Sequence, residues 1–191
     1  PLPHLLVTKL VCISGCSRGL GRAMAIEFSN RGWQVAGGAR DTSALEKLKF
    51  ELITDHFLHP FDITKPEEVV KFANLTKDKL GVPNLLVNNA GCETVSHVLD
   101  MEEEEWDKVL QVNLKGPFLC SKEAAKRMDI NGGGVIINIS SIHDVVPRKG
   151  LIHYCSAKAG LKMFSKCLSL ELADKNIRVV SVAPGAIETS M

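Results

Sequence analysis

The chain has 191 residues, of which 45% are hydrophobic and 24% charged, and its formal net charge is +1 at pH 7. This length and composition suit one globular domain with a buried core, and they exclude a disordered or fibrous protein. Lysine and arginine are scattered and no apolar run could span a bilayer, so we expect no nucleic-acid and no membrane partner. Residues 1–11 lack the cleavage pattern of a signal peptide, and the sequence therefore predicts a cytoplasmic protein.

Short runs rich in valine and isoleucine alternate with longer amphipathic stretches along the chain. This alternation is typical of βαβ units around a buried parallel sheet. No internal repeat or Pro/Gly/Ser linker divides the chain, so we predict a single domain over residues 1–191. Six strands are predicted, at residues 10–14, 34–38, 57–61, 85–88, 135–140 and 179–182.

A glycine-rich turn follows the first predicted strand. The residues from Ser14 to Gly21 read SGCSRGLG, and an amphipathic helix continues to about Asn30. Glycines allow the backbone to turn tightly and to approach a pyrophosphate, which the positive end of the following helix stabilises. The spacing is GxxxGxG and departs from the commoner GxGxxG, and a glycine turn can also serve packing alone. Its place at the first strand-to-helix turn is what predicts a dinucleotide site.

The end of the second strand bears on the choice of dinucleotide. Enzymes that prefer NAD place an acid about twenty residues beyond the glycines, where it hydrogen-bonds the ribose 2′-hydroxyl. Here the chain has Arg40, and a guanidinium can pair with a 2′-phosphate. Arg18, inside the glycine turn, could approach the same phosphate. Both arginines could instead be solvated, and Asp41 could serve NAD if the strand ended one residue later. We predict NADP(H) in preference to NAD(H).

Two helix starts are predicted further along. Thr64-Lys65-Pro66-Glu67 forms a capping box with an early proline, and Asp100 with Glu103 offers a second box. The acidic run at 102–105 is interpreted as a first helical turn that complements the helix dipole, in preference to a cation site. The six cysteines form no CxxC pair and no cluster with zinc-ligand spacing. We therefore expect free thiols and no metal.

Tyr154 and Lys158 open a later helix. Their i, i+4 spacing places both on one face, where an ammonium group would stabilise the phenolate and lower a phenol pKa that is ordinarily about 10. Ser141, thirteen positions before Tyr154, would supply a hydroxyl to hold a reacting oxygen. Each residue alone has an ordinary explanation. Their order, and their distance from the glycine turn, predict a site for proton transfer.

With these motifs the chain resembles the short-chain dehydrogenase/reductase family along essentially its whole length. Gly15, Gly19 and Gly21 match the family's glycine motif, with Ser14 in place of its usual threonine. Further matches are Asp62, the NNAG segment at 88–91, Asn113, Pro184-Gly185 and Thr189. The resemblance implies an α/β fold of the Rossmann type: a doubly wound parallel sheet with helices on both faces, six strands in the order 3-2-1-4-5-6, and the family's seventh strand missing.

The resemblance also implies roles for these residues. Tyr154 would be the general acid or base, Lys158 would tune it and bind the nicotinamide ribose, and Ser141 would hold the substrate oxygen. Asn113 would relay protons through water to the lysine, and NADPH would deliver hydride to the carbonyl of a small aldehyde or ketone. The implied cofactor-binding residues are Gly15, Ser17, Arg18, Gly19, Leu20, Gly21, Arg40, Asp62, Ile63, Asn89, Ala90, Gly91, Tyr154, Lys158, Pro184, Gly185, Ile187 and Thr189.

Two other functions remain open. A finer resemblance to bacterial glucose 1-dehydrogenases covers 91–93, 141–147 and His153-Tyr154. It would place Glu93, His143 and Asp144 near sugar hydroxyls, with Ser141, Glu93, His143 and Tyr154 as the substrate contacts, whereas His153 could simply pack. The first half, with Ser14 and the turn at 81–84, is closer to general aldehyde and ketone reductases. A non-catalytic NADP-sensing module is disfavoured because Asn113, Ser141, Tyr154 and Lys158 are all present.

The family normally continues for several tens of residues past the Thr189 position, whereas this chain stops at Met191. The resemblance assigns a substrate-covering segment, the seventh strand and an oligomer surface to the missing part. Without it the last strand would be left as an unpaired sheet edge. Either the chain is a C-terminally truncated family domain, or the protein lacks the wall that selects substrate. We favour the truncated domain, and we expect its full-length form to be a homo-oligomer, either a dimer or a tetramer.

Overall fold

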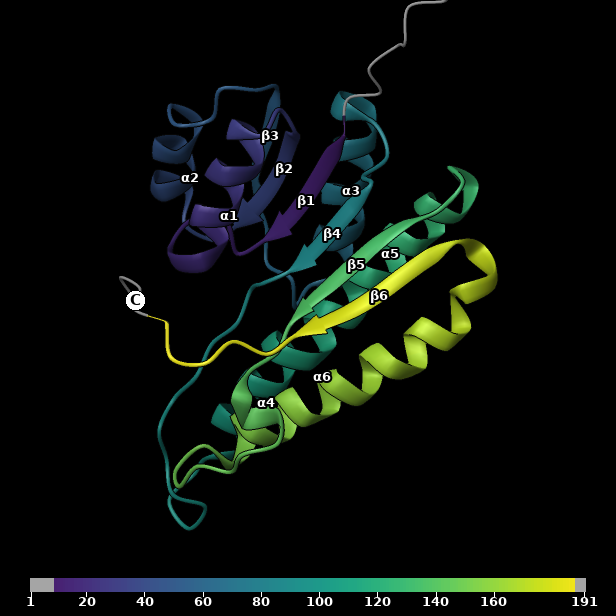
Figure 1. The fold of residues 1–191 in the computed structure, drawn as a ribbon. Helices are drawn as coiled ribbons and strands as arrows, with labels where there is room; N and C mark the ends of the chain where they lie inside the picture. The colour runs from purple at the N-terminus through teal and green to yellow at the C-terminus, as the bar shows by residue number, and fades with distance from the viewer. Residues whose placement is uncertain (1–8, 188–191) are drawn as a thin grey trace, which may run out of the picture.

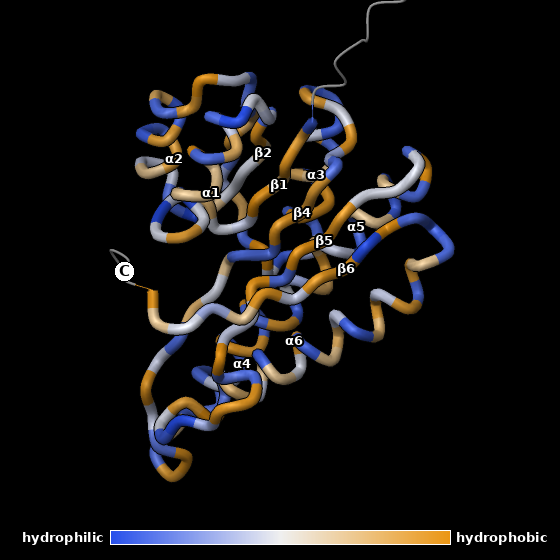
Figure 2. Tube along the Cα trace, viewed as in Figure 1, coloured by the Kyte–Doolittle hydropathy of each residue, from blue (hydrophilic) through white to orange (hydrophobic). Residues whose placement is uncertain are grey.

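A six-stranded parallel sheet forms the centre of the protein, in the order β3-β2-β1-β4-β5-β6 (Figure 1). The computed structural model describes residues 9–187. The predicted parallel sheet and its strand order are confirmed. Apolar residues run along these strands (Figure 2), and every residue of β1 is buried. The strands are β1 (Leu10–Ser14), β2 (Gln34–Ala39), β3 (His56–Pro60), β4 (Leu85–Asn88), β5 (Gly134–Ile139) and β6 (Ile177–Val182).

Six boundaries, in four strands, differ from the prediction by one or two residues. The strand β2 reaches Ala39, which is registered with Pro60, and β3 begins and ends one residue early. The strand β5 likewise begins at Gly134 and ends one residue early, and β6 begins two residues early because Ile177 is registered with Gly134. The hydrogen-bonded ladder with the neighbouring strand sets each limit, whereas the sequence shows only where the apolar run lies.

Helices cover both faces of the sheet, as expected for a doubly wound fold. One face carries α1 (Gly19–Asn30) and α2 (Thr42–Lys49), and the other carries α3 (Pro66–Leu80), α5 (Gly116–Ile130) and α6 (Ile152–Glu171) (Figure 1). The helix α4 (Glu103–Leu110) continues through a π-helical turn, η1 (Gln111–Lys115), into α5. Short 3-10 turns, η2 (Ile142–Asp144) and η3 (Ala173–Lys175), flank α6.

Both predicted capping boxes are wrong. The helix α3 begins at Pro66 with Lys65 as its N-cap, and the Thr64 hydroxyl donates to Asp62 Oδ1 at 2.9 Å instead. Asp62 also accepts from the Thr64 backbone N–H, and this tight turn withdraws the threonine from the helix. The helix α4 begins at Glu103 with Glu102 as its N-cap, while Asp100 lies in the preceding turn. The acidic residues do occupy the first turn of α4, as predicted.

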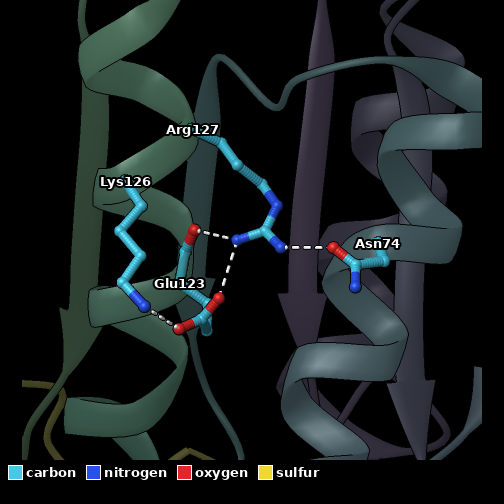
Figure 3. A network of polar contacts seen from close by, with 4 residues as sticks. All are labelled: Asn74, Glu123, Lys126 and Arg127. Atoms are coloured by element: carbon cyan, nitrogen blue, oxygen red, sulfur yellow. Dashed lines mark hydrogen bonds and ion pairs between the residues drawn. The ribbon is translucent and has the colours of Figure 1, made fainter.

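A charged network joins α5 to α3 (Figure 3). Arg127 Nη1 donates to the Glu123 carboxylate at 2.9 Å, and Arg127 Nη2 donates to Asn74 Oδ1 at 2.6 Å. Lys126 Nζ donates to the other Glu123 oxygen at 2.7 Å. Burial by itself would raise the pKa of Glu123, but hydrogen bonds from Lys126 and Arg127 outweigh it and lower the pKa. The network therefore keeps a buried carboxylate charged at the contact between two helices.

Candidate active site

A cleft of about 510 Å³ lies at the carboxyl ends of the strands, where the chain order reverses between β1 and β4. Ligands of open α/β sheets bind at this position. The cleft extends from Arg18 and Arg40 at one end to Tyr154 and Lys158 at the other. Of the predicted cofactor-binding residues within 9–187, all line it except Gly21, which is buried, and Pro184, Gly185 and Ile187.

The glycine turn packs tightly beneath this cleft. Gly15 has a φ of +70°, and its N–H donates to the Gly38 carbonyl at 2.7 Å. A Cβ on Gly15 would lie 2.7 Å from Ala90 Cα, and one on Gly21 would overlap the Gly15 carbonyl oxygen. The Asn89 side chain closes the turn by donating to the Gly15 carbonyl at 3.0 Å. These positions therefore require glycine, and the turn is held against the NNAG segment.

The first turn of α1 faces the cleft with its backbone N–H groups uncapped. Arg18 is the N-cap residue, no side chain caps the helix, and the first turn contains no acid. Backbone N–H groups left without an intrahelical partner, together with the helix dipole, favour an anion at this point. The geometry is that of a phosphate site.

Arg40 follows β2 directly, and its exposed side chain lines the cleft together with Arg18. Asp41 also borders the cleft, but its carboxylate accepts the Ala44 backbone N–H at 3.0 Å and caps α2. The strand β2 ends one residue later than predicted, and the cap engages only Oδ1 of Asp41. The other carboxylate oxygen stays available on the cleft, so Asp41 remains the alternative contact for an NAD ribose.

Tyr154 and Lys158 lie one above the other on α6, with Lys158 Nζ 5.5 Å from the centre of the tyrosine ring. Lys158 is 4% exposed, and its ammonium donates to the Ile139 carbonyl at 2.9 Å. Burial lowers the pKa of Lys158 to about 8. The Lys158 ammonium therefore loses its proton more readily than that of an exposed lysine.

The expected lowering of the Tyr154 pKa is wrong for this structure. Burial raises that pKa, the Ser141 hydroxyl opposes the shift, and the nearby Glu93 carboxylate adds to it. The phenolate loses more hydration in the half-buried site than its neighbours restore. Ser141 is buried at the N-cap of η2, where its hydroxyl accepts the His143 backbone N–H at 3.2 Å. The structure thus brings Ser141, Tyr154 and Lys158 together.

Asn113 lies in the π-helical turn η1 and is fully buried. Its amide Nδ2 donates to the Cys92 carbonyl at 2.7 Å and to the Val109 carbonyl at 2.9 Å. Within residues 9–187 its Oδ1 has no hydrogen-bond partner, although it borders the cleft. A Cβ on Gly91 would lie 2.9 Å from that oxygen. A π-helical turn contains one more residue than an α-helical turn and is frequent at functional sites. Here the π-helical turn sets the orientation of Asn113.

The structure places the predicted substrate residues in different surroundings. Glu93 is exposed and lines the cleft, and the His143 ring lies edge-on to Tyr154 with the ring centres 6.5 Å apart. Asp144 does not reach the cleft, because its carboxylate is bound by Ser140 and Lys162. His153 is buried against Thr94, with Nε2 2.8 Å from the threonine hydroxyl oxygen, and so it packs.

The predicted nicotinamide loop is only partly described. Pro184 accepts the Ile142 N–H at 3.1 Å, but neither it nor Gly185 or Ile187 lines the cleft. Thr189 lies outside the described residues. No group of metal-ligating side chains gathers within residues 9–187. Nor does this part of the chain contain a helix that is long and apolar enough to cross a membrane.

Sequence reasoning missed a buried polar ladder behind the cleft. Asn88 Nδ2 donates to Asn138 Oδ1 at 2.7 Å, and Asn138 Nδ2 donates to Ser165 Oγ at 2.8 Å. The ladder crosses from β4 through β5 to α6 and so fixes the strand ends beside Tyr154. Asn88 belongs to the NNAG segment, which marked the position but not the connection. Cys92, Val112 and Ser140 also line the cleft without having been predicted to do so.

Comparisons with known proteins agree with this geometry. The family model of short chain dehydrogenases matches residues 9–191. Among curated proteins, the 3-oxoacyl-[acyl-carrier-protein] reductase FabG of Staphylococcus aureus, strains Mu50 and MW2, is 34% identical over 190 residues, which cover 97% of this chain and 77% of the relative.

Solved structures give the same result. A putative short-chain alcohol dehydrogenase from Sinorhizobium meliloti 1021 superposes with a TM-score of 0.92 at 31% identity, covering 96% of this chain and 74% of that one. A short-chain type dehydrogenase/reductase from Mycobacterium marinum gives 0.91 at 34% identity, covering 95% and 74%. The chain belongs to the short-chain dehydrogenase family.

Proposed function

We propose that this oxidoreductase uses NADP(H) to reduce the carbonyl of a small aldehyde or ketone, or to oxidise the corresponding alcohol. The observation that carries the proposal is the cleft itself. It joins an uncapped helix N-terminus and two arginines to a tyrosine and a lysine stacked on one helix. One end suits phosphates, and the other suits proton transfer.

The cleft residues fit an NADP(H) molecule. Gly15 and Gly21 leave no room for a Cβ, so the backbone of the turn can approach a pyrophosphate closely. Arg18 and Arg40 offer guanidinium groups to a 2′-phosphate, and one carboxylate oxygen of Asp41 is engaged as a helix cap. FabG relatives at 34% identity are named as reductases, which also supports the reductive direction.

The protein side of the reaction follows from the positions of three groups. Tyr154 would give its hydroxyl proton to the substrate oxygen during reduction and take it back during oxidation. Ser141, whose hydroxyl already lowers the Tyr154 pKa, would hydrogen-bond the same oxygen. Lys158, with Nζ 5.5 Å from the centre of the tyrosine ring, would place a positive charge beside the phenolate. Bound nicotinamide supplies or accepts the hydride at the carbonyl carbon. Asn113, with an unpartnered oxygen among the described residues, would guide the return of the proton.

Apolar side chains favour a carbonyl compound with an apolar part. Val95 and Leu99 lie in the segment after β4, Val145 and Val146 lie after η2, and all four are exposed. The two segments meet at a hydrogen bond of 3.0 Å from the Ser96 N–H to the Gly150 carbonyl (Figure 1). None of these four residues lines the cleft, but Val95 lies two residues after Glu93, which does, and an apolar surface next to a cleft is typical of a binding site.

A sugar dehydrogenase of the glucose type is the second candidate. The exposed Glu93 carboxylate on the cleft, close enough to Tyr154 to raise its pKa, could accept hydrogen bonds from sugar hydroxyls. A non-catalytic NADP-sensing module is less favoured, because Ser141, Tyr154 and Lys158 converge. The single domain, the cytoplasmic location and the homo-oligomeric state stay predictions.

A substrate panel tests the proposal. Aldehydes, ketones and sugars are assayed with NADPH, NADH and their oxidised forms, and turnover is followed by nicotinamide absorbance. We expect faster reduction of an apolar aldehyde or ketone with NADPH than with NADH. Oxidation of glucose without reduction of any carbonyl compound would favour the second candidate. Cofactor binding without turnover of any substrate would favour the sensing module.

A further inference from the structure

A buried carboxylate next to Ser141 has no part in the chemistry proposed above. Asp144 ends the turn η2, and its side chain is only 4% exposed. Its Oδ2 accepts from the Ser140 hydroxyl at 2.8 Å, and its Oδ1 accepts from Lys162 Nζ at 2.9 Å. The Asp144 backbone N–H also donates to the Ser141 carbonyl at 2.9 Å. Asp144 therefore holds Ser140 through its carboxylate and Ser141 through its backbone N–H.

The lysine partner ties this turn to the helix that carries the tyrosine. Tyr154, Lys158 and Lys162 are spaced by four residues and lie along one face of α6. Lys158 bonds the end of β5 through the Ile139 carbonyl, and one turn further along Lys162 bonds Asp144. Two successive lysines thus fasten the Ser141 segment to the same helical face.

We propose that Asp144 and Lys162 form an ion-pair clamp that positions the Ser141 hydroxyl against Tyr154. The clamp rests on the function proposed above for those two residues. The clamp would restrain a short element, because η2 is a single 3-10 turn and the residues that follow it, Val145 and Val146, are exposed. The turn packs against α6, and an ion pair whose buried carboxylate has both oxygens engaged adds a fixed point to that packing. Asp144 and Lys162 are thus positioning residues.

The clamp links the position of Ser141 to the pKa of Tyr154. The Ser141 hydroxyl lowers the Tyr154 pKa against the effect of burial. Movement of η2 would remove this contribution while leaving the glycine turn and the arginines at the far end of the cleft untouched. A loosened clamp should therefore change turnover and its pH profile, whereas NADPH affinity should stay the same.

The test is a double-mutant cycle of Asp144→Asn and Lys162→Met, with kcat, KM, NADPH Kd and melting temperature measured for each variant. Because small misplacements of reacting groups are costly, we expect kcat to fall about 10- to 100-fold in each single variant. NADPH Kd should change less than about twofold. The pH at which kcat responds to Tyr154 should shift upward, as it should in Ser141→Ala. The double variant should lose no more than the worse single variant, because paired residues are not additive.

Two further variants serve as controls. Lys162→Arg keeps the charge and should retain most of the kcat, and Lys166→Met removes an exposed lysine one turn further along α6 and should change nothing. Lys162 is 37% exposed, so Lys162→Met should fold even if the aspartate variant does not. A lower melting temperature with unchanged kcat and pH profile would overturn the clamp. If Tyr154→Phe abolishes turnover while Lys162→Met does not, the clamp fails and the proposed function stands. Retained turnover in Tyr154→Phe would overturn the function itself.

Discussion

Replacement of Arg40 by alanine should weaken NADPH binding without affecting NADH. The side chain follows β2 directly, is exposed, and lines the cleft near Arg18. A hydrogen bond between charged groups contributes about 1.5 to 3 kcal/mol, and exposure to solvent places this one at the lower end. About 1.5 kcal/mol corresponds to a roughly tenfold rise in Kd. If the two arginines act independently, Arg18→Ala/Arg40→Ala should raise Kd about a hundredfold.

The assay is a fluorescence titration of each variant with NADPH and NADH at two salt concentrations. The loss in NADPH affinity should shrink as ionic strength rises, because exposed charges are screened. Arg31→Ala is the matched control. This arginine is also exposed, but it pairs with Glu27 at the far end of α1. Equal losses of NADPH and NADH affinity, or tighter binding of NADH by the unaltered protein, would refute the argument.

Two further predictions concern the scaffold. Gly21→Ala would force a Cβ onto the Gly15 carbonyl, and overpacking of this kind costs about 1 to 3 kcal/mol. NADPH titration should show weaker binding, and thermal unfolding should show a lower melting temperature. Unchanged NADPH binding would contradict the tight turn. Arg127→Met should destabilise the protein by about 1 to 3 kcal/mol at pH 7, because Glu123 loses a charged partner. The Glu123 pKa lies below its ordinary 4.5, so its paired charge stabilises the fold above that pH and less as the pH falls through the folded value. Denaturant unfolding should therefore show a smaller penalty at low pH, and an equal penalty at pH 7 and at low pH would contradict the network.

The sheet was predictable because its signal is local and repeated. Each strand is a short apolar run, and in a doubly wound fold the order of strands and helices leaves few topologies. Most of the glycine turn and Arg40 line the cleft, because both follow strands whose apolar runs were found, although their roles toward a cofactor stay predictions. Strand limits were less accurate because a neighbouring strand sets them, as Ile177 and Gly134 illustrate.

The errors arose where a nearby group competes for a side chain. Thr64 fits a capping box by sequence, yet Asp62 takes its hydroxyl and its N–H. Asp144 was expected to face substrate, but Lys162, eighteen residues later, occupies its carboxylate. The direction of the Tyr154 shift depends on how deeply the ring is buried, and spacing along a helix does not encode that. The π-helical turn around Asn113 likewise has no recognised pattern in the sequence.

The most direct test of the proposed chemistry is Tyr154→Phe. Phenylalanine keeps the ring and removes only the hydroxyl that is to exchange a proton with the substrate oxygen. Turnover with NADPH and the best carbonyl substrate should fall by a factor of about 10² to 10⁴, the usual contribution of a general acid, while NADPH Kd stays within about twofold. Turnover equal to that of the unaltered protein, with NADPH still bound, would contradict the account.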